Sequence, residues 1–280
     1  MDPDYRVIHS IVEGSVNERE GRSHGSLKES LGLKAKQLIS LVGAGGKTAL
    51  MFRLARDLVA EGKKVVTTTT TKIFEPSSGE TAFLIVNRDE EKLKQSVFNH
   101  LEKYKHITIA SERLGLGKLK GVSSSLLNDL WSLQEIDYLI IEADGASGRP
   151  IKAPREGEPV IPSNTTLVVA ILGVDGIGIE LREGNAFQAE RISKITGIPI
   201  GGKVTDEAMA VLMTDPGGIF KEAPPLSRVI AFLNKVDIPD GVTKAKRVAQ
   251  KILEKKHPRI ERIVLGQLRN MAAGFEVIFP

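Results

Sequence analysis

Residues 38–48 read LISLVGAGGKT, an apolar run that passes into glycines and an alanine and then into a lysine and a threonine. A polyphosphate binds at a strand-to-helix turn when backbone N–H groups face it, a helix begins there and a lysine reaches its outer phosphates. A hydroxyl directly after the lysine can complete the coordination shell of Mg²⁺. The stretch therefore predicts a nucleotide-binding loop made of Gly43, Ala44, Gly45, Gly46, Lys47 and Thr48.

Within this loop, Lys47 is the candidate catalytic lysine and Thr48 a candidate metal ligand. The complete Walker pattern needs a glycine at the position that Leu41 occupies here. What remains, G-x-x-G-K-T, is a compressed form that resembles the loop of the amide-forming Mur ligases. The alternative is a glycine-rich turn with an ordinary surface lysine, but a G-K-T string at a strand-to-helix junction favours phosphate binding.

The rest of the chain alternates short apolar runs with segments of helical spacing. Runs rich in Val and Ile, separated by helices, are typical of a mostly parallel sheet that is covered on both faces. We therefore predict an α/β fold, a three-layer P-loop NTPase-like domain over residues 27–280, preceded by a polar tail at residues 1–26. The expected strands are 37–42, 63–70, 83–87, 106–110, 138–143, 166–174, 228–234 and 262–266, and the expected helices are a short one capped by Ser26, 48–62, 90–104 and 242–256.

A second nucleotide motif follows the strand expected at 228–234. Asn234, Lys235 and Asp237 form the string N-K-V-D, which resembles the N-K-x-D guanine motif of GTPases. A carboxylate can accept hydrogen bonds from both N1–H and the 2-amino group of guanine, whereas adenine offers no such pair of donors. The asparagine can connect this segment to the phosphate loop. The alternative is a polar strand end, where these residue types are common.

Two acidic residues end the strand expected at 138–143. Glu142 and Asp144 are two positions apart, so strand alternation directs both side chains to the same side of the sheet. An acid at the end of a core strand beside a phosphate loop is where Mg²⁺ or its water is held. We expect Asp144 in the metal shell, with a catalytic role, and Glu142 as the second choice; the alternative is that one of them only caps the loop.

Two further groups follow strand ends and are candidates for contact with a substrate or partner. Thr70, Thr71 and Lys72 close a threonine-rich strand, where a hydroxyl or a lysine can reach the transferring phosphate. β-Branched packing is the alternative for the threonines. Arg149, Lys152 and Arg155 follow Asp144 among glycines and prolines and can clamp an anion, unless they belong to a solvated face.

Composition removes several functional classes. The 280 residues include no cysteine, which excludes disulfides, thiolate metal sites and cysteine nucleophiles. The formal net charge is +4, and the basic residues are dispersed, so no nucleic-acid partner is expected. The longest apolar stretch is too short to span a bilayer, and the first residues lack the apolar core of a signal peptide. We expect a cytoplasmic protein without membrane partners, whose metal is Mg²⁺ held with a nucleotide.

Taken together, the strings LVGAGGKT, VVTTTTTKI, LIIEADGASGRPIKAP and LNKVD resemble the YqeC family, accessory proteins of selenium-dependent molybdenum hydroxylases. The resemblance extends from about Leu27 to the C-terminus. It implies a role in maturation of these hydroxylases, with a molybdenum hydroxylase or another maturation factor as partner. It indicates a pathway more firmly than a reaction.

Three functional hypotheses follow. The first is a Mg²⁺-dependent GTPase that supports cofactor maturation. The second is an ATP-dependent ligase or kinase acting on a cofactor precursor, which the compressed glycine loop favours. The third is a nucleotide sensor without hydrolysis, whose bound and empty forms contact a partner differently. Base selectivity separates the first from the second, and turnover separates both from the third.

Overall fold

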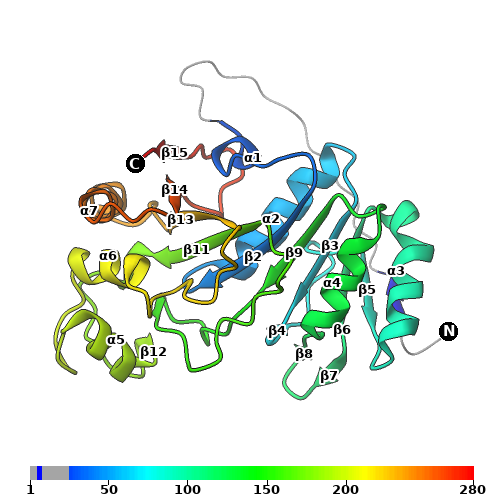
Figure 1. Ribbon diagram of the computed structural model, residues 1–280, viewed down its shortest axis with the longest axis horizontal. Helices are drawn as coiled ribbons and strands as arrows, with labels where there is room; N and C mark the ends of the chain where they lie inside the picture. The colour runs from blue at the N-terminus through cyan, green and yellow to red at the C-terminus, as the bar shows by residue number, and fades with distance from the viewer. Residues whose placement is uncertain (1–4, 8–24) are drawn as a thin grey trace.

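The computed structural model describes residues 5–7 and 25–280, and its centre is a ten-stranded sheet (Figure 1). The strand order is β1-β5-β6-β3-β9-β2-β11-β13-β14-β15. All strands from β5 to β14 in this order run parallel, while β1 and β15 pair antiparallel at the two edges. The strands are β1 Tyr5–Val7, β2 Gln37–Gly43, β3 Val65–Thr69, β5 Phe83–Val86, β6 His106–Ala110, β9 Tyr138–Glu142, β11 Leu167–Gly173, β13 Arg228–Asn234, β14 Ile260–Leu265 and β15 Glu276–Ile278.

Helices cover both faces of this sheet. Strand alternation sends Ile39 and Leu41 of β2 to one face, where they pack in a core with α1 and α2. Leu38 and Val42 point to the other face, where α3 and α4 cover one part and α5 to α7 another. Figure 1 shows these two groups of helices over opposite ends of the sheet. The helices are α1 Leu27–Ser30, α2 Lys47–Ala60, α3 Glu90–Tyr104, α4 Ser124–Ser132, α5 Ala189–Thr196, α6 Asp206–Thr214, α7 Gly241–Glu254 and the 3-10 turn η1 Val174–Gly176.

The predicted fold class is confirmed, because helices enclose a mostly parallel sheet in three layers. Ser26 caps α1 as expected, since its hydroxyl accepts from the N–H of Glu29 and the Glu29 carboxylate accepts from the N–H of Ser26. The tail predicted for residues 1–26 lies largely outside the described residues. Residues 5–7 differ from that prediction, since they add β1 to the edge of the sheet beside β5.

Two small sheets are formed by short strands that lie between strands of the main sheet in chain order. One is antiparallel, in the order β4-β8-β7, with bounds β4 Lys72–Phe74, β8 Lys118–Lys120 and β7 Glu112–Leu114. The other pairs β10 Ile151–Lys152 with β12 Ala186–Phe187 in parallel. Because these strands have two or three residues each, no periodicity in the sequence predicts them.

Candidate functional site

The glycine loop joins β2 to α2 in the conformation that the sequence predicts. Gly43, Gly45 and Gly46 have φ values of 97°, 82° and 146°, where residues with a side chain are strained. A Cβ atom on Gly43 would lie 2.2 Å from the carbonyl oxygen of Ile171, and one on Gly46 would lie 2.1 Å from Nδ2 of Asn234. Both the backbone conformation and the neighbours therefore require glycine here.

Lys47 opens α2, and its side chain folds back over the loop. Its Nζ donates a hydrogen bond to the carbonyl oxygen of Gly43 at 2.6 Å and lies 3.3 Å from Oδ1 of Asp144 and 3.6 Å from Oε1 of Glu142. Burial alone would lower the pKa of Lys47, but the two carboxylates outweigh it and hold that pKa above its usual value. The lysine therefore stays charged inside the loop.

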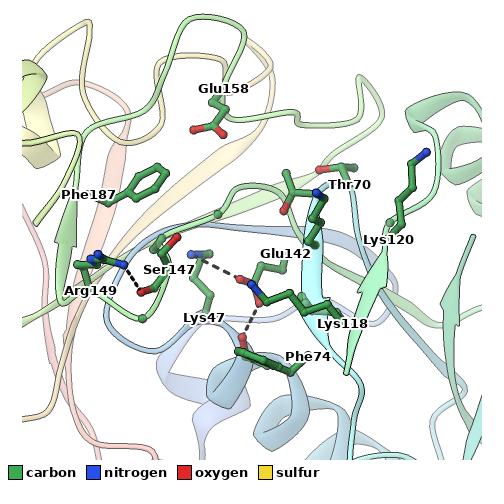
Figure 2. Close-up of a pocket in the computed structure, with 18 of the residues that line it drawn as sticks. Lys47, Thr70, Phe74, Lys118, Lys120, Glu142, Ser147, Arg149, Glu158 and Phe187 are labelled. Atoms are coloured by element: carbon green, nitrogen blue, oxygen red, sulfur yellow. Dashed lines mark hydrogen bonds and ion pairs between the residues drawn. The ribbon is translucent and has the colours of Figure 1, made fainter. Parts of the chain in front are cut away.

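Glu142, the last residue of β9, lies beside Thr48 on the wall of a cavity. Oγ1 of Thr48 donates a hydrogen bond to Oε2 of Glu142 at 2.6 Å. Burial raises the pKa of Glu142, and the charge of Lys47 opposes that shift. Figure 2 shows the ion pair between Lys47 and Glu142 as a dashed line. A hydroxyl and a carboxylate side by side are oxygen ligands of the kind that Mg²⁺ prefers, so these residues fit the ion.

Asp144 lies behind this pair instead of on the cavity wall. Its side chain is fully buried, and its Oδ2 accepts from the N–H of Gly43 at 3.1 Å and pairs with Nζ of Lys152 at 2.8 Å. Lys152 is also fully buried, and it donates to the carbonyl oxygen of Gly145 and to Glu158. Strand alternation brings both acids to Lys47, as expected, but Glu142 takes the position beside Thr48 that the sequence favours for Asp144.

The N-K-V-D segment also meets the loop. Asn234 ends β13, and its Nδ2 donates to the carbonyl oxygen of Gly45 at 2.7 Å, which is the connection that the motif implies. Lys235 has a left-handed backbone with φ of 68° and pairs with Asp175 at 2.5 Å. Asp237 is exposed two residues further on. The segment is therefore anchored at Asn234, while the acid proposed to contact the base faces solvent.

A cavity of about 1270 Å³ extends from the loop across the carboxyl ends of the strands. Of the residues that the sequence singles out, Gly45, Gly46, Lys47, Thr48, Thr70, Thr71, Lys72, Glu142, Arg149 and Lys235 line this cavity. The buried Lys152 does not, since its ammonium group is paired with Asp144 behind the wall and with Glu158, which itself lines the cavity.

The cavity also has lining residues that sequence reasoning does not single out. They are Phe74, Lys118, Lys120, Glu158 and Phe187. They come from the two small sheets and the loop after β10, which tertiary contacts bring to the phosphate loop. Arg155, from the basic segment that the sequence does single out, lines the cavity as well.

Within residues 5–7 and 25–280, no group of three or more His, Asp or Glu side chains is placed to hold a metal ion by itself. No helix in the same ranges combines the length and the apolar character that a bilayer crossing requires.

The parallel sheet and the glycine loop at its central strand define the class first: a three-layer α/β protein with a P-loop-like turn. The chain belongs to the YqeC family. The family model described as YqeC protein matches residues 39–190. The "Uncharacterized protein YqeC" of Escherichia coli (strain K12) is 31% identical over 240 residues, which cover 86% of this chain and 91% of that relative.

Solved structures with a similar arrangement are more distant. The signal recognition particle 54 kDa protein from Aeropyrum pernix K1 in complex with GDP is 19% identical, with a TM-score of 0.37, over 88% of this chain and 44% of that chain. FtsY from Mycoplasma mycoides is 12% identical, with a TM-score of 0.39, over 90% and 67%. HypB from Helicobacter pylori in complex with nickel is 13% identical, with a TM-score of 0.36, over 85% and 81%.

Proposed function

We propose that the protein is a Mg²⁺-dependent nucleoside triphosphate hydrolase that uses GTP. The observation that carries this proposal is the convergence of Lys47, Thr48 and Glu142 at one end of the cavity. A lysine, a hydroxyl and a strand-end carboxylate at a helix N-terminus are the groups that phosphoryl transfer from a nucleotide requires. A purely structural loop gains nothing from burying these three polar groups together.

Each residue has a separate task in this proposal. The N–H groups of the loop and Nζ of Lys47 bind the phosphates, which requires Lys47 to exchange the carbonyl oxygen of Gly43 for a phosphate oxygen. Thr48 and Glu142 are proposed to hold Mg²⁺, which neutralises charge on the phosphates when it is bound. Asp144 keeps the loop and Lys47 in position through Gly43 and Lys152. Lys72, on the cavity wall, is proposed to contact the transferring phosphate.

The choice of GTP depends on the N-K-V-D segment. Asn234 fixes this segment against the loop through Gly45, so a base held at Asp237 would belong to the same nucleotide as the phosphates at Lys47. A site built around the two donors of guanine rejects adenine, because the carboxylate would otherwise lose its hydrogen bonds. Asp237 is exposed, so its carboxylate is accessible to a base.

A ligase or kinase that uses ATP is the second candidate, and one observation favours it. The cavity continues past the loop to Lys72, Arg149 and the β4-β8-β7 sheet, which leaves space for an acceptor beside the terminal phosphate. In either case we propose that the protein acts in the maturation of selenium-dependent molybdenum hydroxylases. That role is supported by the family resemblance, and its partner would be a hydroxylase or another maturation factor.

Nucleotide binding with Mg²⁺ tests the proposal. GTP, ATP and XTP are titrated into the parent chain and into Lys47→Ala and Asp237→Asn variants. We expect a preference for GTP, loss of binding in Lys47→Ala, and a shift towards XTP in Asp237→Asn, because an amide matches the donor-acceptor pattern of xanthine. If the protein instead prefers ATP, and Asp237→Asn does not change its nucleotide selectivity, the ligase or kinase function replaces GTP hydrolysis as the proposal. Absence of binding for all three nucleotides would contradict both.

A further inference from the structure

The small β4-β8-β7 sheet places two lysines opposite each other, an arrangement that does not stabilise the sheet itself. The antiparallel register places Lys72 directly opposite Lys120, and Phe74 directly opposite Lys118. Directly opposed residues point to the same face of a sheet, and like charges in that position are destabilising. The other face holds the buried Ile73 and Leu119, so the lysines share the face that lines the cavity.

Acidic residues nearby do not neutralise this face. Glu112 of β7 lies opposite Lys120 in the register, but its carboxylate forms an ion pair with Arg88. Lys118 lies 5.2 Å from the centre of the Phe74 ring, which is itself two-thirds exposed. Among the described residues, none of the three lysines of this face forms an ion pair. Three positive charges therefore face the cavity without compensation.

The face is held firmly at the end of a core strand. The N–H of Gly121 donates to the carbonyl oxygen of Thr71 at 2.8 Å, and the N–H of Val122 donates to that of Thr69 at 3.0 Å. A Cβ atom on Gly121 would lie only 2.0 Å from the carbonyl oxygen of Thr69, so the two segments are in close contact. The backbone that carries the lysines is thus fixed in place, which lowers the cost of binding a ligand.

Cationic residues also line the opposite wall. Nη1 of Arg149 donates to the carbonyl oxygen of Ser147, while its Nε is buried without a hydrogen-bond partner among the described residues. The guanidinium group of Arg155 lies 4.7 Å from the centre of the Phe187 ring. Figure 2 shows Arg149 and Phe187 on one side of Lys47, with Lys118 and Lys120 on the other. Cationic side chains therefore lie on both walls of the cavity beyond the loop and outnumber the acids there, Glu90 and Glu158.

We propose that this part of the cavity binds a second ligand, a phosphate-bearing small molecule that is distinct from the nucleotide. Two opposed lysines suit a dianionic group, because each charge contributes a donor to the same phosphate. The volume of about 1270 Å³ exceeds the usual range for a single small ligand, so two ligands fit side by side. The inference rests on the proposed nucleotide site, since it places the phosphate of this ligand near the terminal phosphate at Lys47.

Pyrophosphate is the probe for this site, titrated calorimetrically into the full chain after saturation with Mg²⁺ and a non-hydrolysable GTP analogue. The test variant is Lys118→Ala/Lys120→Ala, and the control is Lys103→Ala/Lys194→Ala, which removes two exposed charges that do not line the cavity. We expect the test variant to bind pyrophosphate at least about tenfold more weakly than the parent, with unchanged nucleotide affinity. The control should bind both ligands like the parent.

Three results would overturn the inference. The first is that the saturated parent binds no pyrophosphate, or that both double variants bind it equally. The second is that the test variant loses nucleotide affinity and no second anion binds, which would assign the lysines to the nucleotide itself. The third is that hexaglutamate binds in place of pyrophosphate, which would indicate an acidic protein partner.

Failure of the nucleotide proposal can be distinguished from failure of this one. If no nucleotide binds, the same titration is made in a Lys47→Ala background, where the loop no longer competes for the anion. Dependence of pyrophosphate binding on Lys118 and Lys120 in that background supports an anion site on the small sheet without a nucleotide. If pyrophosphate binding in that background does not depend on Lys118 and Lys120, the anion site is overturned as well.

Discussion

Thr48 and Glu142 are 94 positions apart in the chain, yet Oγ1 of one donates to Oε2 of the other across 2.6 Å. The contact joins the first turn of α2 to the end of β9, the strand that lies directly beside β2 in the sheet. It is the point where the phosphate loop and the strand-end acid become a single site.

The hydroxyl of Thr48 should be needed for the effect of Mg²⁺ on nucleotide binding. We expect Thr48→Ala to lose at least about tenfold in affinity with Mg²⁺ present and little without it, because the variant lacks one metal ligand. Thr48→Ser keeps the hydroxyl and should bind like the parent. Calorimetric titrations with and without Mg²⁺ measure both. If nucleotide affinity falls equally with and without Mg²⁺, Thr48 stabilises the fold and does not bind the metal.

Asp144 should be needed mainly for stability. Its replacement by Ala leaves Lys152 buried without its closest charged partner, and breaking a buried pair from one side costs about 3–5 kcal/mol of unfolding free energy. Adding Lys152→Met should recover part of that loss. Glu102→Ala, which removes an exposed carboxylate paired with Lys64, is the control and should change stability little. Urea unfolding gives each value, and a loss no larger than that of the control would refute the argument.

Gly43 should tolerate no side chain because of its neighbours as well as its backbone. Gly43→Ala would place a methyl group 2.2 Å from the carbonyl oxygen of Ile171, whereas Gly62, which also has a positive φ of 77°, has open space around it. Each substitution imposes backbone strain of about 1–2 kcal/mol, and only the first adds a clash. We expect Gly43→Ala to be clearly less stable than Gly62→Ala and to bind no nucleotide. Similar melting temperatures for the two variants would contradict this.

Stability should fall in weak acid because of a buried histidine. Burial lowers the pKa of His106 to about 4 from an ordinary value of 6.5, and its Nε2 is hydrogen-bonded to Oγ1 of Thr67 at 2.9 Å. The unfolded chain therefore binds a proton between these two pKa values that the folded chain does not, so this contribution to stability is complete above pH 6.5 and decreases as the pH falls towards 4.

The measurement is the free energy of unfolding in urea at two pH values. Between about pH 7 and pH 5 the histidine should account for a loss of about 2 kcal/mol. His106→Gln, which keeps a polar group but does not titrate, should lose that much less over the same interval. Parallel behaviour of the parent and the variant would show that other groups cause the acid sensitivity.

Local patterns in the sequence determined the strands and the helix that position the glycine loop. The apolar run before Gly43, the G-K-T string and the helical spacing after it specify a strand, a turn and a helix within 25 residues, because each depends on neighbours in the chain. Alternation along β9 likewise brings Glu142 and Asp144 to one side. The amide of Asn234 could be expected at the loop because it belongs to an N-K-x-D-like motif that ends a core strand.

Tertiary structure decided which of these residues contact one another in the site and which line the cavity. Which acid contacts Thr48 depends on the register between β2 and β9, and that register is fixed by pairing between segments about a hundred residues apart. Lys152 is buried because β10 pairs with β12, so its charge is used within the fold. Lys118 and Lys120 reach the cavity only because β8 pairs with β4. Strands of two or three residues have no periodicity of their own, so their positions follow from non-local contacts.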